Sequence, residues 1–305
     1  MKQWTKITLK ALSGINVNIK KNYKLYRKVQ KMMTPSIKDG FTSLDRKIMS
    51  GDREIPIRVF HPKSSPSSLV MIYIHGGGWV TGDIDSYTPV CVGLAEATSH
   101  TVVSIDYSLA PENPYPAGLD DCYSAVREIY SNPHLLNCRK ENITLVGDSA
   151  GGNLAAVVAL KARDTGDFKP ERQILIYPAT YYDHTEDSPY RSVLENGEDY
   201  LLTAERIQDY MELYVPDPEA RKDPYVAPLL AEDLTGQPKT LIITSEFDPL
   251  RDEGEAFGKK LREHGNTVRV FRMNDAIHGY LGNPLAQDMV ESTYEIINLF
   301  LGEES

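Results

Sequence analysis

Gly147-Asp148-Ser149-Ala150-Gly151-Gly152 is the stretch of sequence that decides the fold. It follows a short apolar, β-branched run at residues 143–146 and precedes a run of small residues with helical character at residues 153–160. A strand that ends in G-x-S-x-G and turns sharply into a helix forms a nucleophile elbow, which exposes the serine hydroxyl above the sheet. The plainer alternative is a helix N-terminus with a capping serine. We favour the elbow, because the rest of the chain supplies the groups that such a serine needs.

Strand-like and helix-like segments alternate from about residue 41 to the end of the chain. The strand-like runs are apolar at nearly every position, as in strands that helices cover on both faces. This alternation predicts an α/β protein with a mostly parallel sheet and a site at the carboxyl ends of the strands. The first two strands are joined by a short loop, so we expect the sheet to open antiparallel. The expected strands span residues 54–61, 69–75, 101–107, 143–147, 173–177, 240–246 and 267–273, and the expected helices span residues 117–130, 150–163, 252–264 and 286–301.

Two segments stand outside this alternation. Residues 180–238 contain no convincing strand, only a helical run at 204–214, and the interval is too long for a plain connection. Residues 1–38 hold ten Lys or Arg and no Asp or Glu, with apolar residues at helical spacing. We expect residues 1–40 to form a helical cap segment on a catalytic domain of residues 41–305, with a cap insertion at about 180–215. A membrane-surface helix is the alternative for the basic segment.

A serine hydroxyl is a weak nucleophile unless a general base lies beside it and a third group orients that base. His278 fits the base, because it follows the last expected strand and precedes Gly279, which permits a tight turn. Asp248 follows the strand at 240–246 and fits the orienting carboxylate. Other acids compete with Asp248, but Asp252 suits a first helical turn and Asp275 can merely bracket the turn before the histidine; the third competitor is Glu246.

Acyl transfer also needs donors for the oxyanion of the tetrahedral intermediate. The segment His75-Gly76-Gly77-Gly78-Trp79 follows another strand, and its glycines let backbone N–H groups approach a ligand. The N–H group of Ala150, just after Ser149, fits the other donor. A phosphate cradle is the alternative for a glycine-rich turn, but neither a P-loop nor a G-x-G-x-x-G frame fits here. We expect His75 to shape the loop and not to act as the base.

These segments together resemble the hormone-sensitive-lipase-like family of α/β-hydrolases. The resemblance rests on the 75–79 and 147–154 segments, on 248–253 and on 278–280, with further matches at 106–112, 115–117 and 224–229. It implies an α/β-hydrolase fold with about eight strands, and a helical cap built from the N-terminus and the 180–215 insertion. It also implies Ser149 as nucleophile, Asp248 and His278 as its partners, Gly77, Gly78 and Ala150 as oxyanion donors, and an option of dimerising through the last strand and helix. The family's usual phenylalanine is replaced by Tyr280.

The amino-acid composition narrows the classes of protein, partner and cofactor that remain. The chain has 305 residues, 41% of them hydrophobic, which fits one large domain with an appendage. A net charge of −10 disfavours nucleic acid as a partner, and no apolar run approaches a membrane span, so we expect no stable membrane insertion. Three cysteines without C-x-x-C spacing and seven histidines without H-E-x-x-H indicate neither a disulfide framework nor a metal site. We expect a cytoplasmic enzyme without a cofactor.

The function expected from these observations is a serine carboxylesterase that acts on short- to medium-chain acyl esters, with a small-molecule ester as its partner. Two alternatives remain. One is a catalytically inactive ligand-binding protein on the hydrolase scaffold, although relatives of that kind lose the histidine that stands here as His278. The other is an interfacial lipase that uses the basic N-terminal segment.

Overall fold

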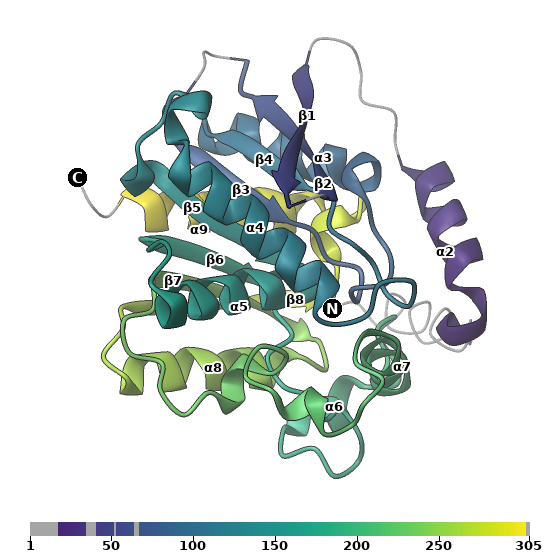
Figure 1. Ribbon diagram of the computed structural model, residues 1–305. Coiled ribbons are helices and arrows are strands. Elements are labelled where there is room, and N and C mark those ends of the chain that lie inside the picture. Colours follow the sequence, from purple (N-terminus) through teal and green to yellow (C-terminus); the bar gives the residue numbers. More distant parts are fainter. Residues whose placement is uncertain (1–17, 35–40, 52, 64–66, 303–305) are drawn as a thin grey trace.

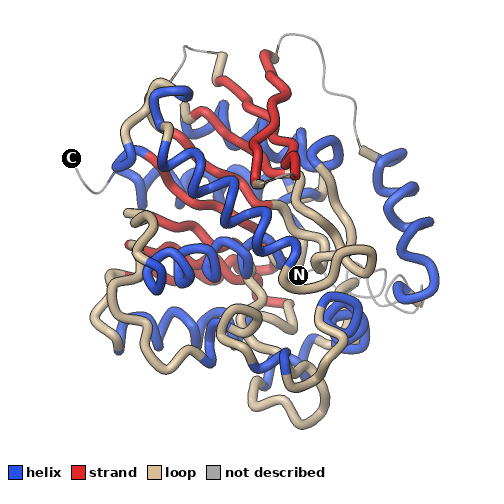
Figure 2. Tube along the Cα trace, viewed as in Figure 1, coloured by secondary structure: helices blue, strands red, loops and turns tan. Residues whose placement is uncertain are grey.

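The computed structural model describes residues 18–34, 41–51, 53–63 and 67–302. They fold around one eight-stranded sheet in the order β1-β2-β4-β3-β5-β6-β7-β8. Figure 2 shows the strands in the middle of the molecule, with helices on both sides. Residues 1–17 and 35–40, which belong to the predicted N-terminal cap segment, lie outside the described residues. The strands are β1 (Thr42–Ser50), β2 (Arg53–His61), β3 (Val70–Ile74), β4 (Thr101–Ile105), β5 (Ile143–Asp148), β6 (Arg172–Ile176), β7 (Lys239–Phe247) and β8 (Val268–Ile277).

Most of the longer helices form two layers, one on each face of the sheet, while α2, α6 and α7 lie outside these layers (Figure 1). Helices α4, α5 and α8 cover one face, while α3 and α9 pack together on the other. The bounds are α2 (Ile19–Met33), α3 (Ile84–Thr98), α4 (Ala117–Ser131), α5 (Ala150–Thr165), α6 (Arg191–Asn196), α7 (Ala204–Tyr214), α8 (Arg251–Glu263) and α9 (Gln287–Gly302), with short 3₁₀ helices at Pro133–Leu136, Lys140–Asn142, Ala220–Lys222, Pro228–Leu230 and Tyr280–Gly282.

Strands β3 to β8 are parallel, and the sheet opens antiparallel as expected, because β2 runs antiparallel to both β1 and β4. The neighbour of β2 is β4, however, and β3 lies on the far side of β4. Among the described strands and α-helices, β1, α3 and the short α6 were not predicted. Strand β1 is exposed at most positions and has no apolar run, and α3 contains Pro89, which weakens a helical pattern.

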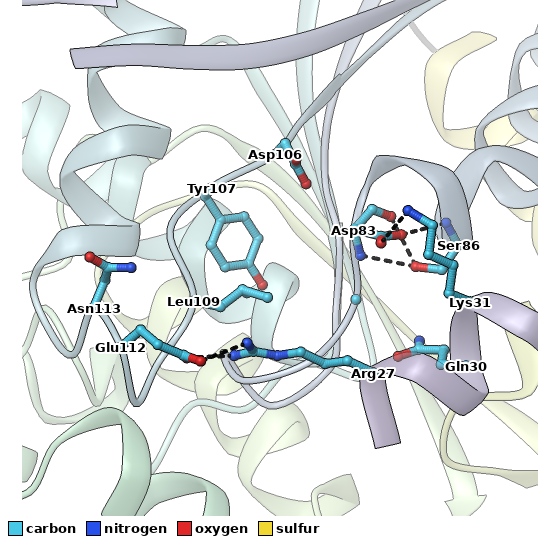
Figure 3. Close-up of a pocket in the computed structure, with 11 residues that line it drawn as sticks. Arg27, Gln30, Lys31, Asp83, Ser86, Asp106, Tyr107, Leu109, Glu112 and Asn113 are labelled. Atoms are coloured by element: carbon cyan, nitrogen blue, oxygen red, sulfur yellow. Dashed lines mark hydrogen bonds and ion pairs between the residues drawn. The ribbon is translucent and has the colours of Figure 1, made fainter. Parts of the chain in front are cut away.

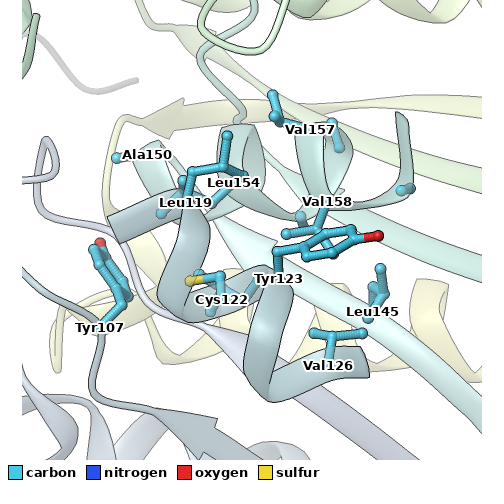
Figure 4. Close-up of a cluster of buried hydrophobic side chains, with 14 of the residues drawn as sticks. Tyr107, Leu119, Cys122, Tyr123, Val126, Leu145, Ala150, Leu154, Val157 and Val158 are labelled. Carbon is cyan, nitrogen blue, oxygen red and sulfur yellow. The ribbon is translucent and has the colours of Figure 1, made fainter. Parts of the chain in front are cut away.

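The core under the elbow lies between α4, α5 and β5. The side chains of Cys122, Leu145, Leu154 and Val158 meet there, fully or almost fully buried (Figure 4). Their close packing fixes α5 on the sheet, because a well-packed interior leaves little freedom for a helix to shift. The first residue of α5 is therefore held at one place above the carboxyl edge of β5.

Candidate active site

Ser149 occupies the turn between β5 and α5. Its backbone has φ 54° and ψ −121°, a conformation that costs free energy for a residue with a Cβ and that clusters at functional sites. A Cβ added at Gly147 would lie 2.2 Å from the carbonyl oxygen of Gly151, and one added at Gly151 would lie 2.0 Å from that of Ile74. Both glycines are therefore required for the close approach of strand and helix. The Ser149 hydroxyl makes no capping hydrogen bond to α5, so the capping-serine alternative does not hold.

His278 lies in the loop just after β8, and its Nε2 is 2.8 Å from Ser149 Oγ. Gly279 follows with φ 76°, the left-handed conformation that turns the chain after the histidine. Asp248 comes directly after β7, is fully buried, and places Oδ2 2.7 Å from His278 Nδ1. Its other oxygen accepts a hydrogen bond from the N–H of Leu250 at 2.9 Å.

The geometry assigns the proton on the imidazole. A carboxylate can only accept, so the His278 Nδ1–H donates to Asp248. Nε2 then carries a lone pair and accepts from the Ser149 hydroxyl. The other acids that were considered for the role of Asp248 have different partners. Asp252 pairs with Arg251 and accepts from the N–H of Ser192, while Glu246 accepts from the N–H of Asp275.

Gly77 and Gly78 form the loop after β3, with φ values of 112° and 61°. A Cβ on Gly77 would lie 2.2 Å from the Thr81 carbonyl oxygen, so the tight turn from 77 to 81 requires glycine there. The carbonyl oxygen of Gly77 accepts from the N–H groups of Val80 (3.2 Å) and Thr81 (2.9 Å). The N–H groups of Gly77 and Gly78 donate to no other group in the described part of the chain.

His75 is buried behind this loop and does not contact Ser149. Its ring stacks on Tyr107 with 4.4 Å between centroids, and its Nδ1–H donates to the carbonyl oxygen of Gly76 at 2.9 Å. Burial lowers the pKa of His75, so the ring is neutral at pH 7. These contacts agree with the expectation that His75 shapes the loop.

Asp148 is a residue of the site that the sequence reasoning missed. Its buried carboxylate accepts from the Gly76 N–H (2.9 Å), from the Tyr73 hydroxyl (2.8 Å) and from the Tyr87 hydroxyl (3.2 Å). Burial raises the pKa of Asp148, against the three donors, which lower it. The carboxylate thus joins the elbow to the glycine loop. The available signal was an acid at the end of an otherwise apolar strand.

Two segments far apart in sequence cover the glycine loop. A Cβ added at Gly78 would lie 2.4 Å from the ring of Tyr210 on α7, and Trp79 stacks on Tyr214 with 4.6 Å between ring centroids. Helix α2 packs against α7, where Lys20 forms ion pairs with Asp209 and Glu212.

The start of the 180–238 interval is anchored to α8. Glu253 accepts from the N–H groups of Thr180 (2.6 Å) and Tyr181 (3.1 Å), and one of its oxygens lies 2.7 Å from His184 Nε2. Across this interval, all of which is described, no strand forms.

The described residues contain no group of three or more His, Cys, Asp or Glu placed to hold a metal ion. None of the described helices combines the length and apolar composition needed to span a lipid bilayer.

Residues 71–282 match the alpha/beta hydrolase fold family. The chain is similar to an arylesterase of Saccharolobus solfataricus, 36% identical over 79% of this chain and 77% of that protein. It is also similar to a carboxylesterase of Mycobacterium tuberculosis, 38% identical over 76% of this chain and 72% of the relative. An ethyl acetate hydrolase of Pseudomonas putida is 31% identical over 74% and 71%.

Among solved structures, a hyperthermophilic esterase from Pyrobaculum calidifontis superposes with a TM-score of 0.84 at 32% identity, and the match covers 99% of each chain. A crystal structure of a mutant of the esterase rPPE gives a TM-score of 0.87 at 31% identity, covering 97% of this chain and 95% of that one. The fold of this chain thus recurs in solved esterase structures over nearly the whole of its length. The chain belongs to the hormone-sensitive-lipase-like family of α/β-hydrolases.

Proposed function

We propose that Ser149, His278 and Asp248 form the catalytic triad with which this chain hydrolyses carboxylic esters. The enzyme is a carboxylic ester hydrolase by family, since its relatives are named arylesterase, carboxylesterase and ethyl acetate hydrolase. The single observation that supports the residue roles is the continuous pair of hydrogen bonds from Ser149 Oγ to His278 (2.8 Å) and from His278 to Asp248 (2.7 Å).

In the proposed reaction, Ser149 Oγ attacks the ester carbonyl carbon while its proton passes to His278 Nε2. Asp248 stays ionised and stabilises the imidazolium. The N–H groups of Gly77, Gly78 and Ala150 donate to the oxyanion. The C–O bond to the alcohol then breaks, and the alcohol leaves with the proton from His278. Water then attacks the acyl-serine carbonyl carbon as its proton passes to the same nitrogen. The bond between that carbon and Ser149 Oγ breaks, His278 returns the proton to Ser149 Oγ, and the acid leaves.

The test of the triad is the Ser149→Ala variant with p-nitrophenyl acetate as substrate. We expect a loss of about 10⁶-fold in kcat, because removing a triad serine leaves only binding and the oxyanion donors. The matched control is Ser131→Ala, which changes an exposed serine at the end of α4 and leaves kcat unchanged. Activity retained above about one part in a thousand would reject Ser149.

A fluorophosphonate probe separates this proposal from the inactive ligand-binding protein. The probe reacts only with an activated serine, so we expect labelling of the unmodified chain and none of Ser149→Ala. A wild-type chain that resists the probe and leaves p-nitrophenyl acetate intact would favour the ligand-binding alternative.

The substrates that we propose are short- to medium-chain acyl esters. The named activity of the Pseudomonas putida relative, an ethyl acetate hydrolase, supports a short acyl group. The measurement is kcat/KM for a series of p-nitrophenyl esters of increasing acyl length, and we expect a maximum at short or medium chains. A steady rise toward the longest chains would contradict this part of the proposal.

An interfacial lipase is the second candidate, because one face of α2 is apolar and exposed. Leu25 is 58% exposed, Val29 43% and Met32 77%, and they lie three or four residues apart on one side of the helix. Exposed Lys21, Lys24 and Lys28 flank them, as in helices that lie at a lipid surface. A lipase would hydrolyse emulsified long-chain esters faster than soluble short ones, and would lose that preference in Val29→Ser/Met32→Ser.

We also propose that residues 1–40 and the 180–215 insertion act as one cap over the site. The ion pairs of Lys20 with Asp209 and Glu212 support this assignment, because they join the described part of the first segment to the second.

A homodimer and a cytoplasmic location complete the proposal. Strand β8 is an edge of the sheet, and Phe271 on it and Leu299 on α9 are exposed. An unpaired edge strand invites pairing with a second copy. Light scattering should give twice the chain mass, and Phe271→Arg should give the monomer.

The proposed cytoplasmic location is supported by the free thiols. Cys91, Cys122 and Cys138 are all buried and unpaired, which fits a reducing compartment.

A further inference from the structure

We infer that Arg27, on helix α2 of the cap, is a positioning residue for the oxyanion loop and acts through two successive peptide groups on the Gly78 N–H. The inference rests on the proposed function, because it assigns a role only if Gly78 donates to an oxyanion. It adds that the cap contributes to the chemical step, in addition to any control of access.

Arg27 makes the densest set of polar contacts that α2 has with the rest of the described chain. Its Nε–H donates to the carbonyl oxygen of Val80 at 2.7 Å, and an Nη2–H donates to that of Ala110 at 2.8 Å. The same guanidinium forms a bidentate pair with Glu112, at 3.1 and 3.0 Å. Its planar fork fixes the direction of each bond, which a lysine ammonium does not do.

Figure 3 shows the pair of Arg27 and Glu112, which lies at a cavity of about 410 Å³. Arg27 extends from α2 toward Glu112, and Leu109 and Tyr107 lie above the pair in this view. Ser149, Asp248 and His278 are not among the residues that line this cavity. The guanidinium contacts Val80, Ala110 and Glu112, and none of the hydrogen bonds described for it goes to the triad.

The first peptide group in the connection joins Val80 to Thr81. Its carbonyl accepts from Arg27, and its N–H, on Thr81, donates to the carbonyl oxygen of Gly77 at 2.9 Å. A trans peptide is planar, so its C=O and N–H point in opposite directions along one line. Fixing the carbonyl of Val80 therefore fixes the direction of the Thr81 N–H.

The second peptide group joins Gly77 to Gly78. Its carbonyl accepts from the Thr81 N–H, from the Val80 N–H and from the Thr81 hydroxyl at 3.0 Å. By the same planarity, the Gly78 N–H points away from these donors. That N–H makes no other hydrogen bond within the described residues and is free to receive the oxyanion.

The series of hydrogen bonds from Arg27 to the Gly77–Gly78 peptide group has an electrostatic consequence as well as a geometric one. Hydrogen bonds in a chain polarise one another, so a cation at the far end makes the last N–H a better donor. The Gly77 N–H has a comparable support, because the His75 Nδ1–H donates to the carbonyl of Gly76 in the same peptide group. Each glycine N–H is thus oriented by a donor on the opposite side of its peptide.

The kinetic signature follows from where the interaction acts. An oxyanion exists in the transition state and not in the bound ester, so a misdirected N–H lowers kcat and leaves KM nearly unchanged. A cap that only controlled access would instead change KM, and would do so differently for short and long acyl chains.

The experiment compares Arg27→Met and Arg27→Lys with the unmodified enzyme, using p-nitrophenyl acetate. The matched control is Lys31→Met, which removes another attachment of α2, the ion pair of Lys31 with Asp85 at 2.9 Å, but no contact to a backbone carbonyl of the loop. We expect kcat to fall about 10- to 100-fold in Arg27→Met, less than the loss from deleting an oxyanion donor outright. Arg27→Lys should be intermediate and Lys31→Met unchanged.

A second readout isolates the oxyanion. A trifluoromethyl ketone adds to the serine as a tetrahedral oxyanion, so its inhibition constant should rise in Arg27→Met by the same factor as kcat/KM falls. A non-reactive ether analogue of the ester should bind unchanged. Equal weakening of both ligands, or a loss confined to KM, would overturn the inference.

The role of Arg27 can be tested even if one of the variants does not fold. If Arg27→Met does not fold, Arg27→Lys decides, since one ammonium cannot reproduce both carbonyl contacts and the bidentate pair; wild-type kcat there would also overturn it. A wild-type chain without esterase activity would instead refute the proposed function. An active wild type whose Arg27 variants are equally active would refute only the role of Arg27.

Discussion

The proposed triad and the proposed cap are held in place by different physical means. Ser149, Asp248 and His278 each follow a strand of the parallel half of the sheet, and the backbone of β5, β7 and β8 brings them together. Helix α2 is held mainly by long charged side chains, those of Lys20, Arg27 and Lys31. Buried backbone contacts are insensitive to salt, whereas exposed ion pairs are screened by it.

Helix α2 illustrates the difference most clearly, because its apolar face points outward. Among the α2 side chains whose burial is described, only Ile19 is fully buried. The residues toward the body are Tyr23, Arg27 and Gln30, while Leu25 and Met32 are exposed. In α5, by contrast, twelve residues are buried in a continuous apolar contact with the sheet. The proposed catalytic half of the site is thus part of the core, and the proposed cap half is attached to it by polar contacts.

Asp248→Asn would break the triad side with the largest expected effect. An amide in place of the carboxylate accepts poorly from the Nδ1–H and does not stabilise the imidazolium, so we expect kcat for p-nitrophenyl acetate to fall about 10⁴-fold. Asp275→Asn is the matched control, since this exposed acid lies three residues before His278 and Asn tolerates its φ of 60°. Similar losses in the two variants would contradict the assignment of Asp248.

Gly78→Ala tests the contact between the two halves. The new methyl group would meet the ring of Tyr210, and the φ of 61° is unfavourable for alanine, so we expect activity to fall about 10²-fold. Adding Tyr210→Ala should recover part of that loss, because it removes the steric conflict and leaves only the strain.

Gly166→Ala is the control for backbone strain alone. Gly166 has φ 72° at the end of α5, and a Cβ there would have nothing within 4 Å. We expect thermal unfolding at a lower temperature with unchanged kcat. If Gly78→Ala also lowered only the unfolding temperature, the oxyanion role of the loop would be contradicted.

The meeting of Ser149, His278 and Asp248 could be predicted from the sequence because each of them is tied to a local pattern. Ser149 needs glycines on both sides for the strand to turn into the helix. Asp248 follows the apolar strand β7, and His278 follows β8, whose residues 268–273 include four apolar side chains. In a parallel sheet such strand ends lie at one edge, so local patterns place distant residues together. The parallel strands and the helices beneath the elbow were predictable for the same reason, since their cores are apolar runs.

The remaining features depend on contacts that no local pattern records. Strand β1 shows only Ile48 buried, and it exists because β2 offers it a pairing edge. The orientation of α2 depends on acids far away in sequence, such as Glu112 and Asp209, which bind its basic residues. The role of Asp148 depends on Tyr73 and Tyr87, whose hydroxyl groups reach it only after the sheet and α3 are in place.

Asp148→Asn tests how the core half is held together, and we expect a smaller effect than in the variants above. Asparagine can still accept from the Gly76 N–H and the Tyr73 hydroxyl, so the fold should persist. Because burial raises the pKa of Asp148 in the folded protein, the folded state holds the proton more tightly than the unfolded one. The contribution of Asp148 to stability is therefore fully present below its unfolded pKa of 3.8 and is lost as pH rises through the raised value.

The measurement is the free energy of unfolding in urea for both proteins between pH 4 and 7. The variant does not titrate at this position, so its stability relative to the wild type should increase with pH and then level off. A difference that decreases with pH would mean that the three donors, and not burial, control this carboxyl.

Lys20→Met tests the cap half alone and should have the smallest effect. Lys20 is partly exposed and pairs with Asp209 and Glu212, and pairs of this kind contribute about 0–1 kcal/mol at low salt. We expect KM for longer acyl esters to change at low ionic strength while kcat for p-nitrophenyl acetate stays the same, because Arg27 still holds the loop. At about 1 M NaCl the wild type should approach the variant, since salt screens the same attraction. If salt instead lowered kcat in both proteins equally, the ion pairs of α2 would be part of the catalytic half, and the distinction between a core-built triad and a charge-attached cap would fail.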